Sequence, residues 1–258
     1  MPISPLSTGL VSITFRKLSP EQIVELVAQA GLSAIEWGGD VHVPPGDEQQ
    51  AAHVRRLTEN AGLAVAAYGS YYSAAHDTAE TLGRILMTAK TLGAPTVRVW
   101  AGKRGSKDAD AEHVRRVTQD LQRAADEAAK LGLTVTIEYH GGTLTDTLET
   151  TVSLLDAIDR PNVRTGWQPR DSIATEAGVA EIKRLAPRLG NLHVFQWWPT
   201  GKTRLPLADG ADRWKPFLAA AAAVGPRDAL IEFVKGDDPE QFLADAQVLK
   251  AWLTSLGA

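Results

Sequence analysis

The sequence of 258 residues contains no cysteine, so it can form neither a disulfide scaffold nor a thiolate metal site and offers no cysteine nucleophile. It also lacks an excess of basic residues, because its formal net charge is -4 at pH 7, which argues against nucleic acid as a partner. No apolar run approaches the ~20 residues that a membrane span needs. Residues 1–5 lack the basic and apolar regions of a signal peptide. We therefore expect a cytoplasmic protein that acts on a small molecule and binds neither nucleic acid nor membrane.

What the sequence does contain is a repeated succession of an amphipathic helical pattern, a glycine and a short apolar run. Glycine just past a helix supplies the left-handed conformation that ends it. The first three of these glycines are 31 residues apart, which is close to one-eighth of the chain and to the size of one strand–helix unit. The glycines at these junctions are Gly31, Gly62, Gly93, Gly132, Gly190 and Gly225.

The helical and apolar segments alternate along the whole chain. Ser19, Pro20 and Gln22 predict a helix that begins with a capping box. Further helices are expected at residues 77–92, 107–131, 145–158 and 239–256. The apolar runs predict strands near residues 10–14, 33–37, 63–68, 96–100, 133–138, 162–167, 191–195 and 228–233.

Eight such strands alternating with helices indicate an α/β fold, a single (β/α)8 TIM barrel that spans residues 1–258. An open doubly wound sheet is the alternative. That fold more often carries a glycine-rich phosphate turn after its first strand, and the segment "VSITFRKLSPEQ" has none.

The residues of unusual chemistry lie where the predicted strands end, which is where TIM barrels place their active sites. Aromatic faces can pack against the C–H faces of sugar rings, while polar groups nearby bind the hydroxyls. Basic residues of the loop after the seventh strand can reach an anionic or hydroxyl-rich substrate. The candidate substrate-binding residues are Trp37, Tyr68, Arg98, Trp100, His140, Arg204 and Lys235.

Two carboxylates, Glu138 and Glu232, each end a strand that is otherwise apolar. A buried carboxylate is costly unless it is paired or binds a metal. Together with His193 they would supply two oxygens and one nitrogen to a divalent cation such as Mn²⁺, Mg²⁺, Co²⁺ or Zn²⁺. In the alternative interpretation, the two glutamates form ion pairs with Arg98 or Lys235.

Three short motifs carry a family resemblance: "TIEYHGGT" at the fifth strand, "NLHVF" at the seventh and "LIEFVKGD" at the eighth. In this order and spacing the chain resembles the xylose-isomerase-like TIM-barrel superfamily, which includes ketose 3-epimerases, hydroxypyruvate isomerase, inosose dehydratase and the endonuclease IV group. The resemblance implies one divalent metal held by a glutamate, an aspartate, a histidine and a glutamate on strands five to eight. On this chain those positions are Glu138, Gln168, His193 and Glu232.

The sequence departs from that pattern at the sixth strand, where "TGWQPRDS" places Gln168 at the aspartate position and Asp171 at a usual histidine position. A glutamine can bind a metal through its amide oxygen but brings no charge. We therefore expect weaker metal retention and a stronger Lewis acid. The endonuclease branch is set aside, because it needs many more histidines than the six present and a DNA-binding surface.

The resemblance implies an isomerase or epimerase of a sugar or keto-sugar, with Glu138 and Glu232 moving protons next to a carbonyl through an enediolate. Mn²⁺ is the expected cofactor, with Mg²⁺, Co²⁺ or Zn²⁺ as alternatives. Two other functions stay open: a keto-sugar lyase that works by β-elimination, including a deglycosylating one, and a non-catalytic sugar-binding barrel with a degenerate metal site. A homodimer could bury the aromatic residues Trp197 and Trp198.

Overall fold

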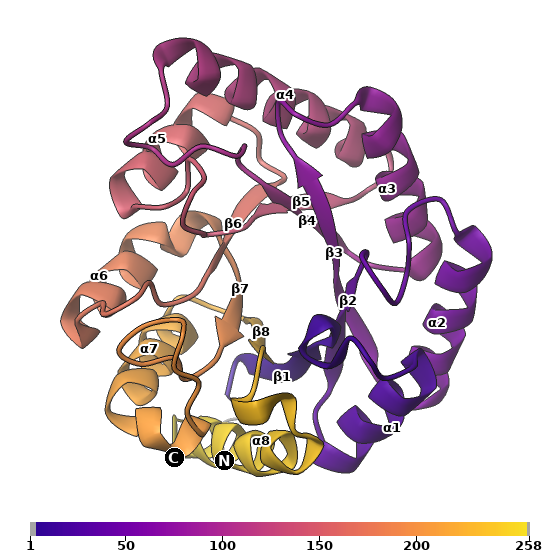
Figure 1. Ribbon diagram of the computed structural model, residues 1–258, viewed down its shortest axis with the longest axis vertical. Coiled ribbons are helices and arrows are strands. Elements are labelled where there is room, and N and C mark those ends of the chain that lie inside the picture. Colours follow the sequence, from indigo (N-terminus) through magenta and orange to yellow (C-terminus); the bar gives the residue numbers. More distant parts are fainter. Residues whose placement is uncertain (1–3, 257–258) are drawn as a thin grey trace. The chain divides into compact units, whose positions relative to one another are not determined.

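The computed structural model describes residues 4–256. Eight parallel strands form a closed barrel in the order β1 to β8, and a helix follows each strand along the chain (Figure 1). The expected (β/α)8 TIM barrel is therefore confirmed, and closure excludes the open doubly wound sheet. Within the described residues, no helix combines the length and apolarity needed to cross a membrane.

The strands match the expected positions, except that the first begins and ends earlier in the chain and the third continues to Ser73, beyond the expected residue 68. Residues 12–14, which we expected to be part of the first strand, belong to a short 3-10 helix, η1 (Ser12–Phe15). The first half of the true strand contains the exposed Ser7, so it shows no continuous apolar run. The strands are β1 (Leu6–Val11), β2 (Ala34–Gly38), β3 (Ala64–Ser73), β4 (Thr96–Trp100), β5 (Thr134–Ile137), β6 (Val163–Trp167), β7 (Leu189–Val194) and β8 (Arg227–Ile231).

Capping residues set the helix boundaries. Ser19 and Gln22 form the expected capping box: the Ser19 amide donates to Gln22 Oε1 at 2.8 Å, and the Gln22 amide donates to Ser19 Oγ. The helices are α1 (Pro20–Ala30), α2 (Glu48–Asn60), α3 (Ala79–Leu92), α4 (Ala111–Lys130), α5 (Leu148–Ile158), α6 (Thr175–Leu185), α7 (Ala211–Ala223) and α8 (Pro239–Leu256). Short 3-10 helices are η2 (Ala186–Arg188), η3 (Leu207–Gly210) and η4 (Lys235–Asp237).

The junction glycines end helices as expected, with one exception. Gly31 and Gly93 follow α1 and α3 in the left-handed conformation, with φ of 64° and 79°. Gly190 was wrongly expected to end a helix, because it lies inside β7. Helix α6 ends at Leu185, and η2, which contains Pro187, joins it to β7 before Gly190 is reached.

The chain comprises two compact units. Unit 1 contains residues 1–36, 57–64 and 167–258, and unit 2 contains residues 37–56 and 65–166. The assignment of residues 1–258 to one domain stays a prediction.

The core of unit 1 is built on the paired strands β1, β7 and β8. In register, Leu10 lies opposite Ile231 and Leu192 opposite Ala229, and these side chains are almost completely buried. Helix α8 packs against β1 and against its neighbours α1 and α7 (Figure 1). Its Phe242 meets the ring of Phe15 in η1 edge to face, with 5.7 Å between the ring centroids. The segment that follows β1 is thereby fixed to the rest of the unit.

The core of unit 2 is built on β3, β4 and β5, with α3, α4 and α5 packed in sequence. Val97 and Val99 of β4 face Val135 and Ile137 of β5 in register, and all four side chains are buried. The same register places Arg98 opposite Thr136, which brings the end of β5 within reach of the Arg98 side chain.

Candidate functional site

The most unusual side chains of unit 1 are Glu36 in β2, His193 in β7 and Glu232 directly after β8, which we call the carboxylate–histidine cluster. Glu36 Oε2 lies 3.2 Å from His193 Nε2, and Glu232 Oε2 lies 3.4 Å from His193 Nδ1. All three residues are buried, with exposed fractions of 1%, 6% and 4%. The Glu232 amide donates to the Val194 carbonyl at 3.0 Å, so the β7–β8 pairing fixes the backbone here. One imidazole is therefore held between two carboxylates.

Electrostatics decide the charge of this imidazole. Burial lowers the pKa of His193, but the carboxylates of Glu232 and Glu36 outweigh burial and raise the pKa to about 10. His193 is therefore an imidazolium at neutral pH in the metal-free protein. Burial raises the pKa of the neighbouring Asp228, and the charge of Glu36 raises it further.

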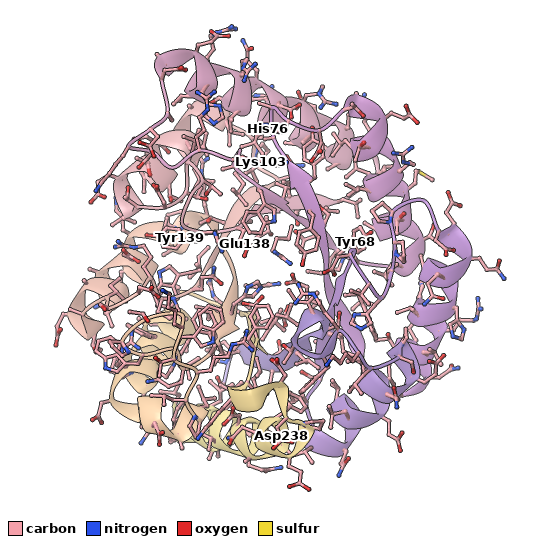
Figure 2. The ribbon with its side chains drawn as sticks, viewed as in Figure 1. Tyr68, His76, Lys103, Glu138, Tyr139 and Asp238 are labelled. Carbon is pink, nitrogen blue, oxygen red and sulfur yellow. The ribbon has the colours of Figure 1, made fainter. Side chains whose placement is uncertain are left out.

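In unit 2, Glu138 directly follows β5, where Figure 2 shows it beside Tyr139. Its carboxylate forms an ion pair with Arg98 of β4, and both side chains are buried. The Glu138 amide donates to the Val99 carbonyl at 2.9 Å, and Thr145 Oγ1 donates to the Glu138 carbonyl at 2.5 Å. Both main-chain bonds fix the position of the residue on β5. The expected alternative, in which Arg98 neutralises Glu138, is therefore what the structure contains.

Glu232 has a different partner from the one that the ion-pair interpretation named. It contacts His193, whereas Lys235 is exposed in the short helix η4. An exposed lysine four residues past the strand remains available to a ligand.

An aromatic surface lies on unit 2, formed by Tyr71, Trp100 and His140. The Tyr71 and Trp100 rings are stacked, with 6.5 Å between their centroids and 20° between their planes. The His140 ring lies 4.6 Å from that of Trp100, and its Nδ1 contacts the Gly141 carbonyl at 2.6 Å. Because Tyr71 is 40% exposed, part of this surface is accessible to a ligand.

Two other candidate substrate-binding residues, Trp37 and Tyr68, lie in the packed interior of unit 2. Both are 0% exposed. The Tyr68 hydroxyl donates to the Val43 carbonyl at 2.7 Å, and burial raises its pKa above the usual range. Trp37 meets the ring of His42 edge to face at 5.8 Å. In this structure both rings stabilise the core of unit 2.

Unit 1 contains the remaining candidates. Gln168 directly follows β6 and is half-buried. Asp171, at the second position of departure, accepts a hydrogen bond of 2.8 Å from the Gly201 amide, so it fixes the loop after β7. Arg204 in that loop pairs with Asp237 at 2.5 Å.

The donor set of the cluster fits a divalent cation in part. Among residues 4–256, no group of three or more His, Asp or Glu side chains is arranged as a ready metal site. However, His193 Nδ1 and a Glu232 oxygen face each other, and Glu36 lies on the opposite ring nitrogen. In metal sites a ligating histidine commonly donates its second N–H to a carboxylate, and Glu36 occupies that place. Glu138 as a further ligand stays a prediction.

Glu36 is the member of the cluster that the sequence interpretation did not single out. A signal for it exists, because β2 reads "AIEW", while the segments around Glu138 and Glu232 read "TIEY" and "LIEF". Each glutamate follows an isoleucine and precedes an aromatic residue at the carboxyl end of a buried strand.

The chain forms a closed parallel barrel and carries buried carboxylates and a histidine at the carboxyl ends of its strands. These two features place it in the class of TIM-barrel proteins that have a polar site at the strand ends. Residues 24–252 match the family described as "Xylose isomerase-like TIM barrel". The chain belongs to this family, as the motifs at the fifth, seventh and eighth strands indicated.

The chain is similar to several proteins of known structure. A probable 3-dehydroshikimate dehydratase involved in petrobactin synthesis, from Bacillus anthracis, has a TM-score of 0.79 at 20% identity, over 95% of this chain and 99% of that one. A D-psicose 3-epimerase has a TM-score of 0.74 at 18% identity, over 98% and 100%. A Mycobacterium smegmatis xylose isomerase-like protein, solved in complex with magnesium, has a TM-score of 0.72 at 14% identity, over 98% of each chain.

A curated relative, 3-dehydroshikimate dehydratase from Bacillus anthracis, is 32% identical over 68 residues. That alignment covers 26% of this chain and 24% of the relative, so the chain spans about a quarter of the length of the curated relative it matches.

Proposed function

We propose that the protein is a divalent-metal-dependent enzyme that removes a proton from the carbon next to a carbonyl of a sugar, a keto-sugar or a related polyhydroxylated ketone. The observation that carries the proposal is the carboxylate–histidine cluster, in which a buried glutamate adjoins a buried imidazolium. Burying two carboxylates and a histidine at strand ends costs stability, and proteins keep such costly groups mainly at functional sites. Perturbed titratable groups of this kind are typical of catalytic sites.

In this proposal Glu232 is the general base. Its carboxylate accepts the proton from the substrate carbon, and the electron pair of the broken C–H bond moves to the carbonyl oxygen to give an enediolate. Return of the proton to the former carbonyl carbon, with transfer of the hydroxyl proton of the first carbon to the former carbonyl oxygen, gives isomerisation. Return of the proton to the opposite face of the first carbon gives epimerisation. Glu138 as the second acid–base residue stays a prediction for this chain.

His193 and Glu232 would hold the metal ion, with Gln168 at the aspartate position of the family. When bound, the metal would polarise the carbonyl and the neighbouring hydroxyl of the substrate. Glu36 would accept the Nε2–H of His193 and so keep Nδ1 directed toward Glu232. The magnesium complex of a structural relative supports the choice of a divalent ion.

Within unit 2, the stacked surface of Tyr71 and Trp100, with His140 next to it, has the aromatic faces and the polar group that a sugar-binding surface uses. Arg98 forms an ion pair with Glu138 and fixes its carboxylate. These roles follow from exposure and contact within unit 2, and they differ from the structural roles of Trp37 and Tyr68.

Dehydration is the second candidate reaction, because the curated relative and a structural relative are both described as dehydratases. It would share the first step with isomerisation. After Glu232 removes the proton, the electron pair forms a carbon–carbon double bond, and the hydroxyl on the next carbon leaves with a proton as water. The chain would then be a lyase.

Exchange of solvent deuterium into substrate tests the shared first step. We expect the protein with Mn²⁺ to incorporate deuterium into at least one of D-psicose, L-ribulose or 3-dehydroshikimate, read by NMR and mass spectrometry. Replacing Glu232 with Gln should lower the exchange rate at least 100-fold, because a positioned base contributes about 10²–10⁴-fold. Glu240→Gln, at an exposed position in α8, is the matched control.

Two outcomes would contradict the proposal. One is a Glu232→Gln variant that exchanges as fast as the parent. The other is a parent protein that binds these compounds but incorporates deuterium into none of them, whether Mn²⁺, Mg²⁺, Co²⁺ or Zn²⁺ is present. That result would favour the non-catalytic sugar-binding barrel.

A further inference from the structure

Unit 1 contains a cavity of about 520 Å³ that none of the functional roles above uses. It is lined by the segment after β1, by the segment after β8 and by Arg204 from the loop after β7. We call it the Phe233 pocket and define it by Phe15, Arg16, Lys17, Arg204, Phe233 and Asp237. All of these segments leave the carboxyl ends of β1, β7 and β8, which are the same strand ends that carry His193 and Glu232.

The charge of the pocket is opposite in sign to that of the whole chain. Arg16, Lys17 and Arg204 bring three positive charges, and Asp237, paired with Arg204 at 2.5 Å, brings one negative charge. The chain as a whole has a formal net charge of -4. A local excess of cations around a cavity raises the local concentration of anionic ligands and lowers their energy when bound. The pocket is therefore suited to an anion.

Phe233 forms one wall of the pocket and has an unusual backbone. Its φ of 51° lies in the left-handed region, which is rare and strained for a bulky residue. Two hydrogen bonds hold this conformation: the Phe233 amide donates to Thr14 Oγ1 at 3.0 Å, and Trp197 Nε1 donates to the Phe233 carbonyl at 3.4 Å. Such strain persists where the surroundings impose it, and it is often found at ligand sites.

The Phe233 ring contacts two of the three basic side chains of the pocket, Arg16 and Arg204. The guanidinium carbon of Arg204 lies 4.9 Å from the centroid of the Phe233 ring, and that of Arg16 lies 5.7 Å away. Arg204 also lies 5.4 Å from the Trp197 ring. Cation–π contacts of this kind fix a guanidinium. Arg16 Nη1 also donates to the Ile13 carbonyl at 3.2 Å and Arg204 Nη1 pairs with Asp237, so a ligand would meet the other N–H groups of these planar side chains. The pocket thus joins an aromatic wall to positioned donors for a carboxylate.

Phe233, which lines the pocket, directly follows Glu232, the proposed general base. The pocket wall and the base are therefore consecutive residues of the chain. Phe15 and Phe233 supply apolar walls that a strongly hydroxylated neutral sugar would not use. A compact organic acid combines a carboxylate for the arginines with a carbon skeleton for these rings.

We infer that the Phe233 pocket binds the carboxylate of the substrate, so that the substrate class is a carboxylated cyclic ketone or keto acid instead of a neutral sugar. This inference rests on the proposed function for the chemistry at Glu232, but the anion site itself stands on unit 1 alone. Arg16 and Arg204 contact the carboxylate, Lys17 adds charge at the edge, and Phe233 contacts the ring.

Binding of a simple probe tests the site without any turnover. In calorimetry with metal-free protein at low salt, benzoate should bind at least tenfold more tightly than benzyl alcohol, which has the same ring and no charge. Arg16→Gln should weaken benzoate binding about tenfold, while Arg16→Lys should retain most of it. Arg184→Gln, an exposed arginine of α6 outside the pocket, is the matched control and should bind as the parent does. Added NaCl should weaken the binding.

Two binding results would overturn the inference: benzoate that binds no more tightly than benzyl alcohol, or an Arg16→Gln variant that folds as the parent does and binds benzoate equally well. The deuterium-exchange assay separates this inference from the proposed function. Exchange into 3-dehydroshikimate in preference to D-psicose supports both. Exchange into D-psicose alone keeps the proton chemistry and overturns the acid substrate. Charge-selective benzoate binding without exchange into any ketone keeps the anion site and overturns the proposed function.

Discussion

Three glutamates with nearly the same local sequence make three different contacts in this protein, two of them with the same histidine. Glu36 contacts Nε2 of His193, Glu232 contacts Nδ1 of the same ring, and Glu138 forms an ion pair with Arg98. The local pattern of isoleucine, glutamate and aromatic residue indicates only that a carboxylate ends a buried strand. For Glu138 and Glu232 the partner comes from a paired strand, β4 and β7 respectively, whereas Glu36 of β2 contacts His193 of β7, which does not pair with β2. The role of each glutamate is therefore set by the closed barrel and not by its own segment.

Glu36→Gln is expected to destabilise the metal-free protein by about 1–2 kcal/mol at pH 7, because His193 loses one of its two charged acceptors. Urea unfolding measures this change, and ¹⁵N NMR of the His193 ring should show a lower pKa. Glu240→Gln, in the exposed first turn of α8, should leave both quantities unchanged. A Glu36→Gln protein with the stability and the ring titration of the parent would show that Glu36 does not position His193.

The titration of His193 predicts how the stability of the metal-free protein depends on pH. Its folded pKa of about 10 lies above the usual value of 6.5, so its contribution is fully present below pH 6.5 and is lost as the pH rises through 10. Between pH 7 and 9 the folded state holds one proton more than the unfolded state. The free energy of unfolding should therefore fall by roughly 1 kcal/mol per pH unit.

Urea titrations at pH 7, 8 and 9 in the presence of a chelator would measure this slope. The His193→Gln variant should lack it. A parent whose stability is constant over this range would mean that His193 is already neutral at pH 7.

Sequence reasoning identified Glu138, Glu232 and His193 because each interrupts an apolar strand. It did not separate ion pairing from metal binding for Glu138, since the approach of Arg98 depends on the β4–β5 register, which no single segment encodes. It also assigned Tyr68 to substrate binding because it lies near a strand end. Its burial follows from packing against the loop around Val43, which is distant in the sequence.

At the scale of the element, the capping residues explain where the expected helices and the observed ones differ. A helix expected from residue 107 begins at Ala111, because Asp110 accepts a hydrogen bond of 2.7 Å from the His113 amide. A helix expected from residue 77 begins at Ala79, after the N-cap Thr78. Periodicity in the sequence predicts that a helix exists, whereas a single side-chain hydrogen bond fixes its first residue.

Helices α6 and α7 pack closely where Gly178 of α6 meets Phe217 of α7. A Cβ added at Gly178 of α6 would lie 2.4 Å from Cε1 of Phe217, which packs edge to face on Trp167 and Trp214. Gly178→Ala should therefore lower the free energy of unfolding by about 1–3 kcal/mol, because the buried rings must move.

Gly83→Ala in α3 is the matched control, since no atom lies within 4 Å of the added Cβ. It should raise the stability by about 0.5–1 kcal/mol, as expected for alanine in place of glycine inside a helix. Thermal and urea unfolding of both variants test the pair. Equal effects at the two positions would show that α6 and α7 do not pack as closely as described.

At the scale of the whole molecule, the fold could be predicted from the sequence because the pattern that indicates it is local and recurs along the chain. Each glycine-terminated helix and each short apolar strand belongs to another copy of the same strand–helix unit. A wrongly predicted boundary in one copy, such as that of β1, therefore leaves the predicted topology unchanged. The site is different, because Glu36 and His193 are 157 residues apart in the sequence and each is needed only once. Its assembly depends on closure of the sheet, not on any local pattern.

Metal binding at the carboxylate–histidine cluster should change the number of protons that the whole protein holds. A metal ion on His193 must displace the proton that Nδ1 shares with Glu232, because the metal-free ring stays protonated up to a pKa of about 10. Mn²⁺ binding should therefore release about one proton, and the affinity should rise about tenfold per pH unit between pH 6 and 8. Calorimetry in two buffers with different ionisation enthalpies measures the proton directly. Glu240→Gln should release the same proton, whereas Glu232→Gln should bind Mn²⁺ more weakly. If Mn²⁺ binds with the same heat in both buffers, no proton leaves and His193 is not a ligand.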